Sequence, residues 1–201
     1  MSDDVPSPQV LLLPGWQPAA SGHWLSLWQA AHGYRLVAQH DWVRPLRGDW
    51  MMQLEEAVLQ SKPAPTPVVT LVANSLGCLL VAAWAAHSRH SHLVKAALLV
   101  APLDAEREAL RARLASWSPI PWQPLPFPSL LMGSHDDPDC SFMRAQAMAT
   151  AWGSEFLDCA APGRLDAASG AHAWPQGYAQ LVQLLGSGRP SARLAVGTAH
   201  P

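Results

Sequence analysis

The chain has 201 residues, of which 49% are hydrophobic and 14% are charged, and its formal net charge is -2 at pH 7. This length and apolar content suit a single globular domain with a substantial core, and they argue against an extensively disordered chain. Because Lys and Arg form no run and the net charge is slightly negative, we expect no nucleic-acid partner.

The first residues of the chain contain no targeting or membrane signal. Residues 1–7 carry two aspartates and no Lys or Arg, and the apolar run 10–13 is too short for a signal-peptide core or a membrane span. The three cysteines, Cys78, Cys140 and Cys159, have spacings that fit no zinc or disulfide framework, so we interpret them as reduced packing thiols. The sequence therefore predicts a cytoplasmic protein without membrane contact, metal or cofactor.

Short apolar runs alternate with longer amphipathic segments along the chain, which is typical of a mostly parallel sheet flanked by helices. The predicted strands are Gln9–Leu13, Arg35–Ala38, Val68–Ala73, Ala96–Val100, Ser129–Met132 and Glu155–Asp158. The predicted helices are Trp24–Ala31, Trp50–Gln60, Leu76–Ser88, Ala105–Trp117, Phe142–Trp152 and Tyr178–Leu185. The expected architecture is an α/β three-layer sandwich with about six strands.

The segment 118–128 has five prolines in eleven residues, so we expect it to form a connection at the end of the sheet instead of a helix or a central strand. We see no domain linker or internal repeat. Residues 1–187 are predicted to form one domain, and residues 188–201 are predicted to be a flexible tail because they are rich in Gly, Ser, Pro and Ala.

A serine follows the third predicted strand in the segment Ala73-Asn74-Ser75-Leu76-Gly77, directly before an apolar helical run. Strand, sharp turn and helix form the context of a nucleophile elbow, which needs small residues two positions before and two after the serine. Ala73 and Gly77 fill these positions. We therefore predict Ser75 to be a nucleophile, the alternative being that Ser75 or Asn74 merely caps the helix.

Acyl transfer needs two backbone N–H groups to hold the carbonyl oxygen of the substrate. Leu76, at the predicted helix N-terminus, is one candidate donor. Trp16, in the loop Leu13-Pro14-Gly15-Trp16 after the first predicted strand, is the other, and Gly15 would let the backbone approach the substrate closely. The alternative is that this loop is an ordinary glycine turn.

The chain order Ser, acid, His of the catalytic triad directs the search for the remaining members. Asp136 and Asp137 follow the strand predicted over Ser129–Met132, and either one could orient a histidine or belong to an Asx turn or a helix start. Two histidines come later in the chain, His172 and His200. Because His200 lies in the predicted tail, His172 is the candidate base.

These segments together resemble the small serine hydrolases related to retinoblastoma-binding protein nine, which are compact α/β-hydrolases without a lid. The resemblance covers nearly the whole chain. It rests on Leu13-Pro14-Gly15-Trp16, His23-Trp24 with Trp28, Gln39-His40-Asp41-Trp42 with Pro45 and Trp50, the segment 71–78, Leu98-Leu99-Val100-Ala101-Pro102, Ser134-His135-Asp136-Asp137-Pro138, and Ser169-Gly170 with Trp174-Pro175.

Carried over by position, the resemblance implies Ser75 as nucleophile and Asp137, the aspartate directly before proline, as the acid. The family histidine usually follows a glycine, and the matching pair here is Gly163-Arg164. A guanidinium stays protonated and cannot accept the serine proton. Three hypotheses are open: His172 acts as a displaced base, the protein is an impaired hydrolase that keeps its pocket, or the substitution is recent or artificial.

The predicted function is that of a serine hydrolase, which cleaves a small carboxylic ester, thioester or amide through an acyl-enzyme. We expect the substrate to contact Gly15, Trp174 and Asn74, which replaces the histidine that commonly precedes the family nucleophile. The alternative is a catalytically impaired binding or interaction protein on the same fold, because Arg164 occupies the histidine position. No particular protein partner is indicated.

Overall fold

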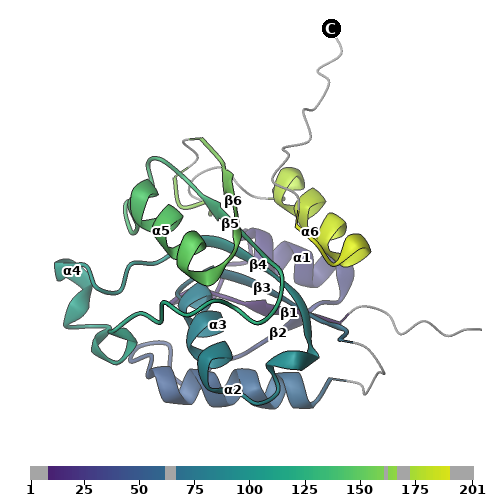
Figure 1. Cartoon of the computed structure of the whole chain (residues 1–201), viewed down its shortest axis with the longest axis horizontal. Helices are drawn as coiled ribbons and strands as arrows, with labels where there is room; N and C mark the ends of the chain where they lie inside the picture. Colours follow the sequence, from purple (N-terminus) through teal and green to yellow (C-terminus); the bar gives the residue numbers. More distant parts are fainter. Residues whose placement is uncertain (1–8, 62–66, 161–162, 167–172, 191–201) are drawn as a thin grey trace, which may run out of the picture.

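The computed structural model describes residues 9–61, 67–160, 163–166 and 173–190, which form three layers around a central sheet (Figure 1). All six strands are parallel, in the spatial order β2-β1-β3-β4-β5-β6. They are β1 (Gln9–Leu13), β2 (Arg35–Leu36), β3 (Val69–Ser75), β4 (Val94–Pro102), β5 (Ser129–Gly133) and β6 (Glu155–Asp158). The predicted α/β sandwich is confirmed, and each predicted strand overlaps an observed one.

Helices cover both faces of the sheet. One face carries α1 (Trp24–His32) and α6 (Pro175–Ser187), while α2 (Arg47–Leu59), α3 (Leu76–His87) and α5 (Phe142–Trp152) cover the other (Figure 1). A sixth helix, α4 (Glu108–Arg111), is short and lies at one end of the molecule. None of the helices in the described part of the chain is long and apolar enough to cross a membrane.

The helix predicted over Ala105–Trp117 is wrong. Only the four residues of α4 and a separate 3-10 turn, Ala115–Trp117, are helical there. The second turn is held by long-range contacts, since the Trp117 side chain is buried and its indole N–H donates to the carbonyl of Pro45 at 2.7 Å. Tertiary packing of the Trp117 ring therefore interrupts a segment whose local pattern favours one continuous helix.

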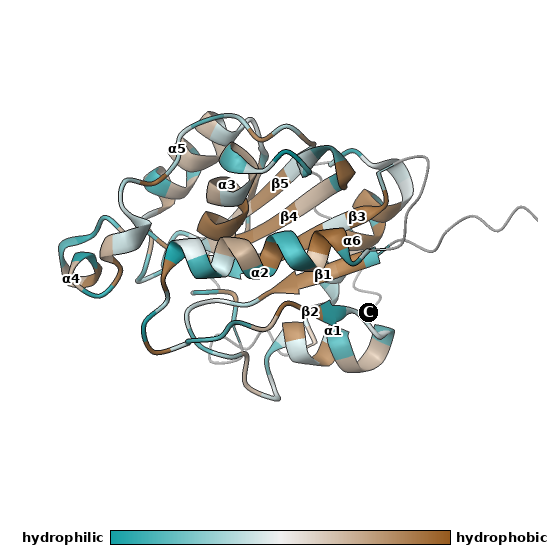
Figure 2. Cartoon of the chain, turned by 90° about the horizontal axis from the view of Figure 1, so that it is seen from below, coloured by the Kyte–Doolittle hydropathy of each residue, from teal (hydrophilic) through white to brown (hydrophobic). Residues whose placement is uncertain are grey.

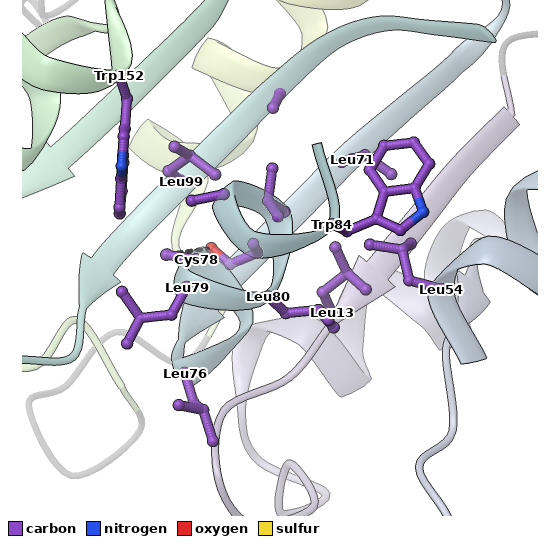
Figure 3. Packing of buried hydrophobic residues seen from close by; sticks show 14 of the residues in the cluster. Leu13, Leu54, Leu71, Leu76, Cys78, Leu79, Leu80, Trp84, Leu99 and Trp152 are labelled. Carbon is purple, nitrogen blue, oxygen red and sulfur yellow. Dashed lines mark hydrogen bonds between the residues drawn. The ribbon is translucent and has the colours of Figure 1, made fainter. Parts of the chain in front are cut away.

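The central strands and α3 form the apolar middle of the molecule, which the hydropathy colouring in Figure 2 makes visible. Nine of the twelve residues of α3 are buried, so this helix has no solvated stripe. Figure 3 shows its side chains packed among Leu13, Leu54, Leu71 and Leu99, which come from β1, α2, β3 and β4. Such burial fixes the start of α3 relative to the carboxyl ends of three strands.

Tryptophan indoles tie loops to this core. The indole N–H groups of Trp24 and Trp28 on α1 donate to the carbonyls of Leu165 and Ala173, at 2.7 and 3.1 Å. Trp152, at the end of α5, donates in the same way to the Pro-rich connection at Pro121 (2.7 Å). Each ring is buried, and each satisfies a backbone acceptor far away in the sequence.

The end of β1 and the first turn of α3 approach each other closely at Gly77. A Cβ atom at this position would lie 2.5 Å from the carbonyl oxygen of Leu13 and 3.0 Å from that of Pro14. Both of these atoms are backbone, so neither can rotate away. Glycine is therefore required here by the spacing between β1 and α3.

We expect Gly77→Ala to lower the free energy of unfolding by about 1–3 kcal/mol, because the added methyl group must push the two chain segments apart. Chemical denaturation followed by circular dichroism measures this change. The matched control is Gly48→Ala in α2, where an added Cβ meets nothing within 4 Å. The control should be neutral or slightly stabilising, and equal effects at both glycines would contradict the packing argument.

Candidate active site

Ser75 is the last residue of β3 and directly precedes α3, as the sequence predicted for an elbow. Its φ of 54° and ψ of -117° place it in a strained region for a residue with a side chain. The Ser75 side chain makes no capping hydrogen bond to α3. The neighbouring Asn74 amide instead donates to the carbonyl of Val100 at 3.3 Å. The capping alternative therefore does not account for this turn.

The loop after β1 lies directly beside Ser75. A Cβ atom added to Gly15 would sit 3.0 Å from the Ser75 Cβ and 3.4 Å from its Oγ. Glycine at this position therefore leaves the space in which a substrate carbonyl must reach the hydroxyl. Leu76 follows Ser75 directly and begins α3, while Trp16 follows Gly15 in the β1 loop and lines the same pocket as Ser75. These are the two residues whose backbone N–H groups were expected to hold an oxyanion.

A pocket of about 420 Å³ opens above Ser75 at the carboxyl ends of the strands. It lies where the strand order reverses between β1 and β3, the place at which open parallel sheets bind ligands. The carboxyl end of β3 and the segments that follow β1, β4, β5 and β6 contribute to it. Its lining residues include Gly15, Trp16, His23, Asn74, Ser75, Ala101, Leu103, Leu110, Arg113, Asp137, Asp139, Arg164 and Asp166.

The two candidate acids have different surroundings. Asp137 lines the pocket and accepts the backbone N–H of Asp139 at 2.8 Å. Burial raises the pKa of the Asp137 carboxyl to about 6, and the Asp139 carboxylate adds to the rise while Arg164 opposes it. Asp136 is exposed and accepts the Ser134 hydroxyl (2.6 Å) and the Gly163 N–H (2.7 Å). Its contacts hold two loops together outside the pocket.

Arg164 lines the pocket and is paired with two carboxylates. Its Nη1 lies 3.2 Å from Asp139 Oδ2, and its Nε lies 3.3 Å from Asp166 Oδ2. The hydrogen bond to Asp139 raises the pKa of the guanidinium above its already high ordinary value. Arg164 is therefore a fixed cation, at the position where the resemblance predicts the family histidine, and a guanidinium cannot take a proton from Ser75.

His23 is a pocket histidine that the sequence did not single out for chemistry. Its Nδ1 accepts the backbone N–H of Leu25 at 3.2 Å, which caps the N-terminus of α1. Burial lowers the pKa of the imidazole, while the Asp166 carboxylate and the Asn74 side chain raise it. A neutral imidazole that accepts at Nδ1 carries its proton on Nε2, so this ring has no spare lone pair for a serine proton.

Two other site predictions have different outcomes. His172 lies outside the described residues. Trp174 does not line the pocket: it is buried against Trp24 and Trp28, with ring centroids 5.1 and 6.2 Å away. A Cβ at Gly177 would lie 2.2 Å from the Trp174 ring, so glycine lets this ring fold over the first turn of α6 and into the core. The structure therefore does not bring Trp174 to the pocket, and its contact with the substrate stays a prediction.

Among the described residues, no group of three His, Cys, Asp or Glu side chains could hold a metal ion. The cysteines are free, and Cys78 and Cys140 are buried. Burial raises the pKa of the Cys140 thiol to about 12, so this thiol stays protonated and unreactive. The described residues therefore give the pocket a hydroxyl, an imidazole, three carboxylates and two guanidinium groups.

The parallel sheet, the strained serine after β3 and the adjoining glycine loop after β1 define an α/β-hydrolase fold. Within this class, the chain belongs to the serine hydrolase family, which it matches over residues 10–183. This agrees with the resemblance to the relatives of retinoblastoma-binding protein nine. The chain matches none of the curated proteins with which it was compared.

Solved structures show the same fold. A protein described as a YdeN-like hydrolase of Pectobacterium atrosepticum has a TM-score of 0.78 and 26% identity, covering 92% of this chain and 94% of its own. The ydeN gene product of B. subtilis has a TM-score of 0.71 and 17% identity, covering 90% and 100%. Esterase 2 of Thermogutta terrifontis has a TM-score of 0.62 and 18% identity, covering 93% and 86%.

We expect Asp137→Asn to raise the melting temperature at about pH 7.5, because a desolvated carboxylate is removed from the folded state. A carboxyl with a raised native pKa stabilises the fold most at low pH, and this stability is lost as the pH rises through about 6. The difference in melting temperature between the variant and the parent should therefore become smaller towards about pH 4.5. Thermal unfolding followed by circular dichroism at both pH values measures it.

Asp136→Asn is the matched control, with the opposite sign. The Ser134 hydroxyl and the Gly163 N–H hold the pKa of Asp136 below its ordinary value. The ionised carboxylate therefore stabilises the fold at pH values above the ordinary pKa of an aspartate, and this stability is lost as the pH falls. Asp136→Asn should lower the melting temperature at about pH 7.5. Shifts of the same sign in both variants would contradict the assignment of a buried and an exposed carboxylate.

Proposed function

We propose that the protein is a serine hydrolase of the esterase type that cleaves a small carboxylic ester, thioester or amide. The observation that carries this proposal is the strained Ser75 at the end of β3, which opens into the pocket beside Gly15. Backbone strain of this kind is maintained where the surrounding structure requires it and where function benefits from it. Membership of the serine hydrolase family supports the same chemistry.

The proposed reaction begins with attack of Ser75 Oγ on the substrate carbonyl while a base takes the hydroxyl proton. The N–H groups of Trp16 and Leu76 stabilise the tetrahedral oxyanion. Collapse of this intermediate breaks the bond to the leaving alcohol, thiol or amine, which receives the proton, and leaves an acyl group on Ser75. Water then attacks the acyl-enzyme while the same base takes its proton. The bond between the acyl carbon and Ser75 Oγ breaks, Oγ receives this proton, and the carboxylic acid leaves.

We assign the role of base to His172 and the role of orienting acid to Asp137. His172 has the chain position that the triad order requires, and the capping bond of His23 argues against the described pocket histidine. Asp137 is the acid because it lines the pocket, whereas Asp136 is bound to Ser134 and Gly163.

The ionised form of Asp137 is the one that orients a histidine, so activity should fall as the pH drops below about 6.

A second candidate function is favoured by Arg164. Its ion pairs with Asp139 and Asp166 hold a permanent cation where the family has its base. A protein of this kind keeps a pocket that binds an ester or a related ligand, without a complete proton relay. Oxyanion donors and binding alone retain a residual catalysis of about 10³-fold over water when a triad member is lost.

Labelling with a fluorophosphonate probe and hydrolysis of short p-nitrophenyl esters test the two functions. The parent should be labelled and active at neutral pH, and Ser75→Ala should be neither. Esterase 2 of Thermogutta terrifontis has been solved phosphonylated by sarin, which supports the choice of an organophosphorus reagent. A parent that is not labelled would contradict the hydrolase proposal, and full activity in His172→Ala would remove that residue as the base.

Arg164→His tests the proton relay directly. Under the second candidate function, in which the parent lacks a base, a histidine at position 164 should raise kcat/KM for p-nitrophenyl butyrate by about 10²-fold or more, the range of general-base catalysis. A parent that already uses His172 as its base should gain little. Arg164→Gln is the matched control, because it removes the charge without supplying a base, and it should give no such gain. Equal activity in both variants would show that position 164 does not serve the nucleophile.

A further inference from the structure

Arg113 stands over the residue expected to supply an oxyanion donor. It follows α4, lines the pocket together with Leu103 and Leu110, and its guanidinium carbon lies 4.1 Å from the centre of the Trp16 ring. A cation held on an aromatic face is restrained in position while the edges of its fork stay open to a ligand. The Trp16 ring itself packs against the core, so it supports the guanidinium from below.

The charge of Arg113 has no counterpart among residues 9–61, 67–160, 163–166 and 173–190. The other pocket arginine, Arg164, is bound to Asp139 and Asp166, whereas no carboxylate of these residues forms an ion pair with Arg113. The Arg113 side chain is also exposed at the pocket opening. A guanidinium in this setting is suited to a bidentate bond with a planar anion.

We propose that Arg113 binds a carboxylate of the substrate, so that the preferred substrates are esters that carry a free carboxyl group several atoms from the scissile bond. This inference rests on the proposed function, because the Trp16 N–H fixes where the scissile carbonyl lies relative to Arg113. A monoanion is favoured over a dianion, since Asp137, Asp139 and Asp166 line the same pocket and repel further negative charge.

The kinetic test compares p-nitrophenyl butyrate with the mono-p-nitrophenyl esters of succinic, glutaric and adipic acid. We expect the parent to prefer one of the half-esters, and Arg113→Gln to lower the ratio of kcat/KM for that half-ester over butyrate by about tenfold, the usual loss for one charge-assisted contact. Arg113→Lys should restore part of this ratio. Arg111→Gln, whose guanidinium bonds the Glu106 carbonyl outside the pocket, should keep the parental ratio.

The same series with 4-acetoxybenzoate distinguishes a carboxylate on the alcohol side from one on the acyl side. If the Arg113-dependent preference appears only with 4-acetoxybenzoate, the carboxylate belongs to the leaving group, and the proposal holds in that form. A parental ratio that Arg113→Gln leaves unchanged for all of these substrates would overturn it, even when the neutral ester is hydrolysed well.

A binding measurement keeps the inference testable if the proposed hydrolysis fails. Titration calorimetry of Ser75→Ala with monomethyl glutarate should give an affinity about tenfold higher than with dimethyl glutarate, and Ser75→Ala/Arg113→Gln should lose this difference. Because Ser75→Ala cannot turn over, this result does not depend on the base. Equal affinity for the acid and the diester would overturn the role of Arg113, whatever the parent does to esters.

Discussion

The contact between the end of β1 and the first turn of α3 sets the geometry of the whole site. Because the Leu13 and Pro14 carbonyls leave no room for a side chain at Gly77, α3 starts directly beside the β1 loop. This position forces the chain at Ser75 into its strained turn and brings Gly15 against the serine hydroxyl. The burial of α3 then holds this turn in place, so the backbone N–H groups proposed as oxyanion donors would be arranged before any substrate enters.

Local sequence patterns predicted the sheet and the nucleophile turn, and they failed where distant segments meet. Each strand and the turn at Ser75 is formed by consecutive residues, so apolar runs and the small residues around Ser75 were sufficient to predict their positions. The helix predicted through Trp117 failed because the Pro45 carbonyl accepts a hydrogen bond from the indole. The burial of Trp174 was not foreseen, because it depends on Gly177, which lets the ring fold into the core. His23, Arg113, Asp139 and Asp166 come from separate loops, and no spacing links them.

The charged groups of the pocket explain how the arginine at position 164 is accommodated there. Asp139 and Asp166 satisfy the guanidinium of Arg164 from two sides, so the cation adds no unpaired charge to the site. Its field also favours the ionised form of Asp137, which burial disfavours. An arginine at position 164 is therefore compatible with a folded pocket.

The indoles of Trp24 and Trp28 fix the chain at Leu165 and Ala173, on either side of the segment that contains His172. Both bonds come from one helix, α1, and both rings are buried in the core. The path of the chain between β6 and α6 is therefore set in part by an element from the other end of the sequence. A change that shifts α1 would move the ends of this connection, although α1 itself carries none of the groups proposed for proton transfer.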